Sequence, residues 1–372
     1  MNKIYLILLL SFLNANIISD LNKKINISRE NAITNSISLT SSAVVGINVT
    51  QIKTQAFDPF FDPFFSNFFN YNSNRKYKIK NLGSGVIISK DGYIVTNSHV
   101  VENANEIIVS TANGGNYDAI VIGLDELTDI ALIKIDSAED FHYAIFGNSD
   151  DLIVGEWVIA LGNPLGLFDM SNKPMATVGI VSGVGLDFGQ KASGKVYQNM
   201  LQTDASINPG NSGGPLMNVL GEIIGINTFI MTNSGYNQGS IGIGFAIPSN
   251  TVISIIEELK QYGKIERNFI TGLHVQSIDK TMQKLLKIGN KTGVIITNID
   301  SDSSGENAGL LIGDVILKVN NNVIQDISDI LKIINEGLHK VGDFITLDIF
   351  RNGEDKSIQL ELKGINGNEV SY

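Results

Sequence analysis

The amino-acid sequence predicts a mainly β protein, in which a large antiparallel barrel or sandwich precedes a small α+β domain. Three observations support this prediction. Short β-type runs broken by Gly, Asn and Asp follow one another from residue 79 to residue 247, with almost no helical periodicity. The 372 residues include 37 glycines but only 7 prolines, a composition that suits turn-rich β structure. From residue 267 onward, strand-like runs flank an amphipathic helix.

The N-terminal residues precede the predicted domains. An apolar run of about ten residues follows Lys3, which is too short for a bilayer-spanning helix but long enough for the core of a signal peptide. We interpret residues 1–19 as a signal peptide, with a retained N-terminal anchor as the alternative, because Leu13 is bulky for a cleavage site after Ala15. Residues 20–36 are polar and rich in Asn and Lys, and we expect a flexible leader there.

A Phe-rich loop is expected at residues 57–71, after a half-buried strand between residues 42 and 53. Its phenylalanine pairs recur every four residues, but Pro59 and Pro63 are incompatible with a regular helix. Two interpretations remain open. The loop packs on its own domain, or it forms a subunit contact or a gate, because exposed aromatic clusters typically mark interaction surfaces.

The large domain continues with strands and closes with a helix. The clearest strand-like runs lie at residues 85–89, 92–96, 106–110, 130–135, 156–161 and 221–230. The first amphipathic helix follows Pro248, where Ser249 can cap it, and it ends at Tyr262 and Gly263. Its apolar residues share one face: Val252, Ile255, Ile256 and Leu259. The polar stretch that follows marks a domain boundary.

The small domain is expected over residues 267–364, before a tail at 365–372. It combines a strand at 293–299, a helix that begins near Asp326, and a hairpin of strands 345–350 and 357–362. The hairpin turn contains Asn352 and Gly353, a pair that favours a type I′ turn.

Composition excludes several functions. With 27 Lys and Arg against 38 Asp and Glu, the net charge of −11 disfavours binding to nucleic acid. The absence of cysteine excludes a disulfide framework, a thiolate metal site and a cysteine nucleophile. No His–carboxylate cluster has metal-ligand spacing. Residues 189–195 match the pattern GxxxxGK, but Val196 stands where a nucleotide-binding loop needs Ser or Thr.

The strongest chemical signal is the sequence NPGNSGGP at residues 208–215. A nucleophilic serine needs its hydroxyl on a tight turn, with backbone N–H groups converging on the oxyanion. Gly210 permits unusual backbone angles, and we expect Gly213 and Gly214 to leave space beside the attacked carbonyl. Taken alone, the motif also fits a surface turn, so the partners of Ser212 decide between the two interpretations.

A serine nucleophile requires a base. Of the four histidines, His99 directly follows a strand, whereas surface or core roles are expected for His142, His274 and His339. Asp129 opens an apolar strand, where a lone carboxylate is costly, and we expect it to orient the base. The neighbouring Asp125 and Glu126 lie in a polar turn, and we interpret them as solvated.

The chain order His99, Asp129, Ser212 is that of the chymotrypsin-type triad. Together, the motifs TNSHVV, LTDIALIKI, GNPLG, QTDASINPGNSGGPL and IGIGFAIP resemble the HtrA/DegP/DegQ family of serine proteases, over about residues 41–362. The resemblance implies a chymotrypsin-like double β-barrel protease domain over residues 37–263, followed by a PDZ domain at 267–364.

The resemblance also implies residue roles in the protease domain. His99 would be the general base, Asp129 the acid that orients it, and Ser212 the nucleophile. The oxyanion hole would be formed by the N–H groups of Gly210 and Ser212, with Asn211 between them. The residues expected to line the specificity pocket are Ile207, Thr228, Phe229, Ile230 and Met231. Their apolar, bulky walls predict cleavage after small aliphatic residues.

In the PDZ domain, the loop that would bind a peptide carboxylate comprises Ile270, Thr271, Gly272 and Leu273. The family pattern has an apolar residue directly before the glycine, and Thr271 departs from it. The Phe-rich loop falls where HtrA proteases carry a long regulatory loop, which favours the subunit contact or gate.

The resemblance therefore implies an ATP-independent, cofactor-free serine endopeptidase of the periplasm or cell envelope that degrades unfolded or misfolded proteins in a stress response. A homotrimer or a higher oligomer is expected. Two alternatives are a membrane-tethered, site-specific regulatory protease of the DegS kind and a chaperone-type binding protein, which the intact triad disfavours.

Overall fold

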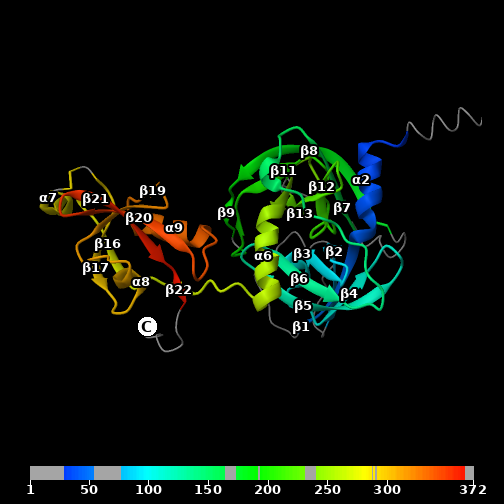
Figure 1. Ribbon diagram of the computed structural model, residues 1–372, viewed down its shortest axis with the longest axis horizontal. Coiled ribbons are helices and arrows are strands. Elements are labelled where there is room, and N and C mark those ends of the chain that lie inside the picture. Colours follow the sequence, from blue (N-terminus) through cyan, green and yellow to red (C-terminus); the bar gives the residue numbers. More distant parts are fainter. Residues whose placement is uncertain are drawn as a thin grey trace, which may run out of the picture. The chain divides into compact units, whose positions relative to one another are not determined.

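The computed structural model describes residues 29–53, 77–163, 173–191, 193–230, 240–286, 288–289 and 291–364. The expected signal peptide, the Phe-rich loop, Met231 and the C-terminal tail lie outside the described residues. The chain forms two compact units (Figure 1). The first comprises residues up to Asp187 together with Asn199–Gln261, and the second comprises Phe188–Gln198 and the residues from Tyr262 onward.

The first unit begins with a closed antiparallel barrel of six strands, in the order β1-β2-β3-β6-β5-β4 (Figure 1). Its strands are β1 (Val44–Lys53), β2 (Tyr77–Ile87), β3 (Tyr93–Thr96), β4 (Glu106–Ser110), β5 (Asn116–Asp125) and β6 (Ile130–Ile135). Fully buried Ile47, Ile94 and Ile133 belong to its core. Their β-branched side chains suit a pleated, buried surface.

A second closed antiparallel barrel has the order β11-β14-β13-β12-β7-β8. Its strands are β7 (Trp157–Gly162), β8 (Met175–Leu186), β11 (Met200–Thr203), β12 (Pro215–Asn218), β13 (Ile223–Ile230) and β14 (Gly244–Pro248). The barrel core includes Val158, Leu201, Leu216 and Ala246. The expected double β-barrel is therefore confirmed.

Helix α2 (Ala32–Thr40) joins the two barrels. Asn31 and Thr34 form a capping box at its start. Its Ile33 and Ile37 pack against a buried cluster drawn from both barrels, Val44, Ile159, Leu161 and Met217. The last helical residue, Thr40, donates a hydrogen bond to the carbonyl of Gly221 (2.8 Å). Residues 32–36 were expected to belong to a flexible leader, and this was wrong because two isoleucines four residues apart suffice to anchor the helix.

The described residues of the first unit contain four further helices. Three are single turns, η1 (Ser41–Ala43), α4 (Ser98–Val101) and η2 (Ser149–Asp151), and the longer α6 (Ser249–Tyr262) follows the last strand of the second barrel. The expected apolar face of α6 is buried. Its first residue, Ser249, donates its hydroxyl to the carbonyl of Gly147 (2.7 Å).

The second unit contains a sheet in the order β16-β17-β18-β20-β21, with β19 paired to β18. The strands of this sheet are β16 (Leu273–Ser277), β17 (Val294–Ile299), β18 (Val315–Val319), β19 (Asn322–Val323), β20 (Phe344–Arg351) and β21 (Glu354–Glu361). A separate pair is formed by β15 (Phe269–Ile270) and β22 (Lys363–Gly364). The helices of the unit are α7 (Lys280–Leu286), α8 (Ser304–Asn307) and α9 (Ile327–Glu336). The hairpin of β9 (Gly189–Gln190) and β10 (Val196–Tyr197) also belongs to this unit.

Two local predictions in this unit are confirmed. Helix α9 begins directly after Asp326, whose side chain caps it. The turn between β20 and β21 has positive φ at both Asn352 (55°) and Gly353 (91°), as a type I′ turn requires.

Candidate active site

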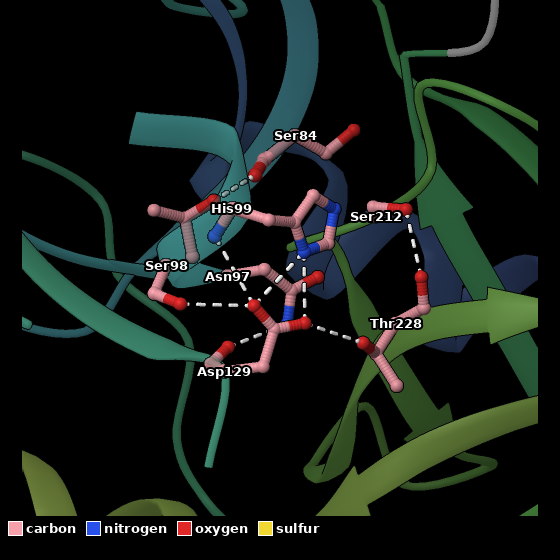
Figure 2. A network of polar contacts seen from close by, with 8 residues as sticks. Ser84, Asn97, Ser98, His99, Asp129, Ser212 and Thr228 are labelled. Carbon is pink, nitrogen blue, oxygen red and sulfur yellow. Dashed lines mark hydrogen bonds and ion pairs between the residues drawn. The ribbon is translucent and has the colours of Figure 1, made fainter. Parts of the chain in front are cut away.

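Three polar side chains that lie far apart in the sequence meet between the two barrels (Figure 2). His99 lies in α4, directly after β3, and Asp129 directly precedes β6. Ser212 lies in the loop between β11 and β12 of the second barrel. The first barrel therefore supplies the imidazole and the carboxylate, and the second supplies the hydroxyl.

His99 and Asp129 form a close pair. The Nδ1 atom of His99 lies 2.9 Å from Oδ1 and 2.8 Å from Oδ2 of Asp129. The carboxylate is completely buried, whereas the imidazole is 19% exposed. Because an ionised carboxylate only accepts hydrogen bonds, Nδ1 carries the hydrogen and Nε2 is the basic nitrogen of the neutral ring. Figure 2 shows the Ser212 hydroxyl on the Nε2 side of this ring.

The buried carboxylate of Asp129 is held by several donors besides the imidazole. Its Oδ1 accepts from the Ser98 hydroxyl (3.0 Å) and from the His99 N–H (3.1 Å), and its Oδ2 accepts from the Thr228 hydroxyl (2.9 Å). Asp129 also has a φ of 63°, in the left-handed region that non-glycine residues rarely occupy. Hydrogen bonds to an ionised group compensate for its burial, so this network stabilises the charged form.

Thr228 forms hydrogen bonds with both Asp129 and Ser212. Its hydroxyl binds Asp129, and its carbonyl oxygen accepts the hydrogen of the Ser212 hydroxyl (2.9 Å). In this resting geometry the serine hydrogen is directed at the main chain of β13, and it turns toward the imidazole by rotation about the Cβ–Oγ bond. The sequence indicated Thr228 only as a pocket residue, and it did not indicate Ser98 at all, although Ser98 is adjacent to His99.

The turn that carries Ser212 depends on its glycines. Gly210 has a φ of 96° and Gly213 a φ of 84°, both in the left-handed region. A Cβ atom at Gly213 would lie 2.2 Å from the Thr96 hydroxyl, and one at Gly214 would lie 2.3 Å from the Leu161 carbonyl. The last two glycines therefore allow the turn to approach strands of both barrels, rather than leaving space beside a substrate carbonyl.

The N–H groups of this turn fall into two pairs. The Asn211 N–H donates to the carbonyl of Asn208 (2.9 Å) and the Gly213 N–H donates to that of Asn227 (2.9 Å). Within the described part of the chain, the N–H groups of Gly210 and Ser212 donate to no other protein group. These are the two groups from which the sequence predicts an oxyanion hole.

Comparisons with known proteins agree with this geometry. The trypsin-like peptidase domain family matches residues 83–226, and the PDZ domain family matches residues 240–362. The periplasmic serine endoprotease DegP of Escherichia coli (strain K12) is 39% identical over 297 residues, which cover 80% of this chain and 60% of that protein. The solved structure of the HtrA-type protease AlgW with decapeptide matches with a TM-score of 0.62 and 32% identity, over 90% of this chain and 98% of that chain. The chain belongs to the HtrA family of proteases.

Other relatives are also named as serine endoproteases. A probable periplasmic serine endoprotease, DegP-like, of Chlamydia trachomatis is 41% identical over 76% of this chain and 54% of that protein. The chain spans about half to three fifths of the length of the curated relatives it matches. None of the helices in the described residues has the length and apolar character needed to cross a membrane.

The expected specificity pocket of this HtrA protein is visible in part. Ile207 is 2% exposed and belongs to the core of the second barrel, and Thr228 is equally buried beside Asp129. The main chain of Phe229 and Ile230 pairs with β14. Their side chains, and the whole of Met231, lie outside the described part of the chain.

The sequence also drew attention to two other acidic residues near Asp129, namely Asp125 and Glu126. Asp125 was expected to be solvated, and this was wrong. It is 6% exposed at the end of β5, where it accepts the Thr128 hydroxyl (2.6 Å). Glu126 is exposed, as expected. Among the described residues, no group of three or more His, Asp or Glu side chains is gathered as metal ligands would be.

The other three histidines form local contacts. His142 contacts the carbonyl of Leu39 through Nε2 (2.9 Å), and the exposed His274 pairs with Asp300 (2.9 Å). His339 follows α9 and is half-buried, and this burial lowers its pKa.

The loop expected to bind a peptide carboxylate lies beside an end strand of the PDZ sheet. Gly272 has a φ of 65°, and its carbonyl accepts from the Asp300 N–H (2.9 Å). The Thr271 carbonyl accepts from the Gly305 N–H (2.9 Å). These bonds direct both carbonyls into the domain. The adjacent strand β16 pairs with β17 alone among the described strands.

Proposed function

We propose that this protein is a serine endopeptidase that cleaves unfolded or misfolded polypeptides in the cell envelope without ATP. The observation that carries this proposal is the pairing of His99 Nδ1 with the buried Asp129 carboxylate, with Ser212 across the imidazole. Such an arrangement can activate a serine that is otherwise a weak nucleophile at neutral pH.

The proposed reaction follows from the geometry. Nε2 of His99 takes the proton of the Ser212 hydroxyl as Oγ attacks the substrate carbonyl, and Asp129 stabilises the imidazolium. The N–H groups of Gly210 and Ser212 bind the oxyanion. The imidazolium then protonates the leaving amine, and a water molecule hydrolyses the acyl-enzyme by the same proton transfers in reverse.

Substrate choice is proposed from the pocket and from the PDZ domain. The sequence predicts the specificity pocket at Ile207 and at Thr228 to Met231, a set without an acidic residue, and this composition favours cleavage after Val, Ala or Ile. The open edge of β16 and the loop from Ile270 to Leu273 suit a peptide C-terminus added as a strand. Small aliphatic residues are buried in folded proteins, so both features favour unfolded chains.

Location and assembly are part of the same proposal. Relatives are named periplasmic endoproteases, and residues 1–19 have the pattern of an export signal. We propose a periplasmic enzyme that acts as a homotrimer or a higher oligomer.

Digestion of unfolded casein by the purified full-length protein, with Ser212→Ala as the matched control, tests this function. We expect multiple cleavages, predominantly after small aliphatic residues, and none by the variant. Undiminished cleavage by Ser212→Ala would remove the proposed nucleophile. A membrane-tethered regulatory protease would instead leave casein largely intact and sediment with membranes. A chaperone-type binder would protect casein without cutting it.

A further inference from the structure

We propose that Ser84 is a positioning residue that holds the oxyanion loop, residues 208–213, in its reactive shape. Ser84 lies in β2 of the first barrel, whereas the loop belongs to the second barrel. The inference rests on the proposed serine endopeptidase function and assigns to Ser84 no contact with substrate.

Ser84 is completely buried, and its hydroxyl, its N–H and its carbonyl all form hydrogen bonds. Its hydroxyl donates to the carbonyl of Gly210 (2.5 Å) and accepts from the N–H of Asn163 (2.7 Å). Its own N–H donates to the carbonyl of Ser212 (2.9 Å), and its carbonyl accepts the Thr96 hydroxyl (2.7 Å). A single residue of the first barrel therefore binds the carbonyls of both residues whose N–H groups are proposed to form the oxyanion hole.

The hydroxyl has one hydrogen, so its direction is fixed by its neighbours. Because the Asn163 N–H donates to the Ser84 oxygen, the hydroxyl hydrogen is left to bind Gly210. Gly210 has a φ of 96°, and glycine has the widest range of accessible backbone angles. The bond from Ser84 restrains the Gly210–Asn211 peptide, which would otherwise rotate at low cost.

Orientation of the oxyanion hole follows from these restraints. With the carbonyls of Gly210 and Ser212 directed toward Ser84, their N–H groups are held in fixed directions through the intervening backbone angles. Preorganised N–H groups stabilise an oxyanion without rearrangement during the reaction. Loss of the hydroxyl would therefore weaken binding of the transition state more than binding of the substrate.

Ser84 could instead be needed only because it satisfies buried carbonyls at the junction of the barrels. Ser249 provides a matched control, since it is also completely buried and its hydroxyl also donates to a carbonyl, that of Gly147. It lies in α6, outside the oxyanion loop. A general effect of deleting a buried hydroxyl would appear equally in both serine variants.

The kinetic test compares full-length wild type, Ser84→Ala and Ser249→Ala on an aliphatic peptide substrate, with a peptide boronic acid as the transition-state analogue. We expect Ser84→Ala to lower kcat about 10- to 100-fold, to weaken boronate inhibition in parallel, and to leave KM within about twofold. The pH dependence of kcat/KM should not move, because the bonds of His99 and Asp129 are intact. Ser84→Cys, which keeps the size but donates weakly, serves if Ser84→Ala does not fold.

Two kinetic results would overturn the proposal. One is a folded Ser84 variant with kcat near that of the wild type, and the other is an equal loss of kcat in Ser249→Ala. Hydrogen–deuterium exchange gives a readout that does not require catalysis. In a Ser212→Ala background, Ser84→Ala should accelerate exchange in residues 208–213 and leave the barrel strands unchanged, and unaltered exchange there would refute the role. If the wild type does not cleave casein, the proposed function fails, while this exchange experiment still decides the role of Ser84.

Discussion

Asp129 combines an unfavourable backbone conformation with the most densely hydrogen-bonded carboxylate of the site. Its φ of 63° costs free energy for a non-glycine residue, and its burial would be costly without partners. The donors from Ser98, His99 and Thr228 compensate for both. Strained residues of this kind concentrate at functional sites.

Asp129→Asn tests the charge without altering the backbone, because asparagine also tolerates the left-handed region. The variant should fold normally, but its amide can stabilise the wrong imidazole tautomer. We expect kcat/KM on a peptide substrate to fall about 10³- to 10⁴-fold, with the melting temperature nearly unchanged. Turnover close to that of the wild type would exclude Asp129 from the mechanism.

Because His339 is half-buried, we expect the stability of the second unit to depend on pH. Burial lowers its pKa, an effect that Arg267 reinforces and Asp343 opposes. The folded state therefore disfavours the protonated ring, so its stability is complete above the unfolded pKa of about 6.5 and falls as the pH drops toward the folded pKa. We expect the calorimetric transition of this unit to shift to lower temperature in that range.

The matched variant His339→Gln removes the titrating group. It should flatten the dependence of the melting temperature on pH below about 6.5. A pH profile identical to that of the wild type would show that His339 does not titrate differently in the folded and unfolded states.

At the residue scale, the sequence predicted the three proposed catalytic side chains but not the residues that form hydrogen bonds around them. Ser212, His99 and Asp129 lie in distinctive local patterns. The hydroxyls of Ser84, Ser98 and Thr228 do not, because their importance depends on partners that the fold supplies from other strands. Asp125 was misjudged for the same reason, since only the fold places Thr128 against its carboxylate.

At the scale of the elements, α2 depends on tertiary contacts. It is only nine residues long, and it is anchored by Ile33, Ile37 and the hydrogen bond of Thr40. Short isolated helices are marginal in water, and packing decides whether they form. This explains why the sequence predicted a flexible leader. In contrast, the β20–β21 hairpin was predictable because its turn residues act locally.

Ile37→Ala tests the role of α2 as a link between the barrels. We expect the free energy of unfolding of the first unit to fall by about 1–3 kcal/mol, because Ile37 packs on a cluster drawn from both barrels. Leu39→Ala is the control, since Leu39 is 61% exposed on the same helix, and it should change stability little. Equal effects of the two substitutions in urea unfolding would argue against the packing role.

On the scale of the whole molecule, the proposed catalytic residues are divided between the two barrels. The first barrel carries His99 and Asp129, and the second carries Ser212. The order of motifs along the chain predicted this architecture, because the resemblance supplied the topology that strand patterns alone left open between barrel and sandwich. The strand-like runs named from the sequence do not include β5, β8, β11, β12 or β14, which pair with neighbours in the closed barrels. The oxyanion loop belongs to the second barrel and is bound from the first barrel by the hydrogen bonds of Ser84 to the carbonyls of Gly210 and Ser212.

Covalent labelling by a fluorophosphonate, mapped by mass spectrometry, tests most directly whether these three side chains act together. We predict a single adduct on Ser212 in the wild type, with labelling slowed by orders of magnitude in His99→Ala. An adduct on another residue, or equal labelling rates in the two proteins, would contradict the account.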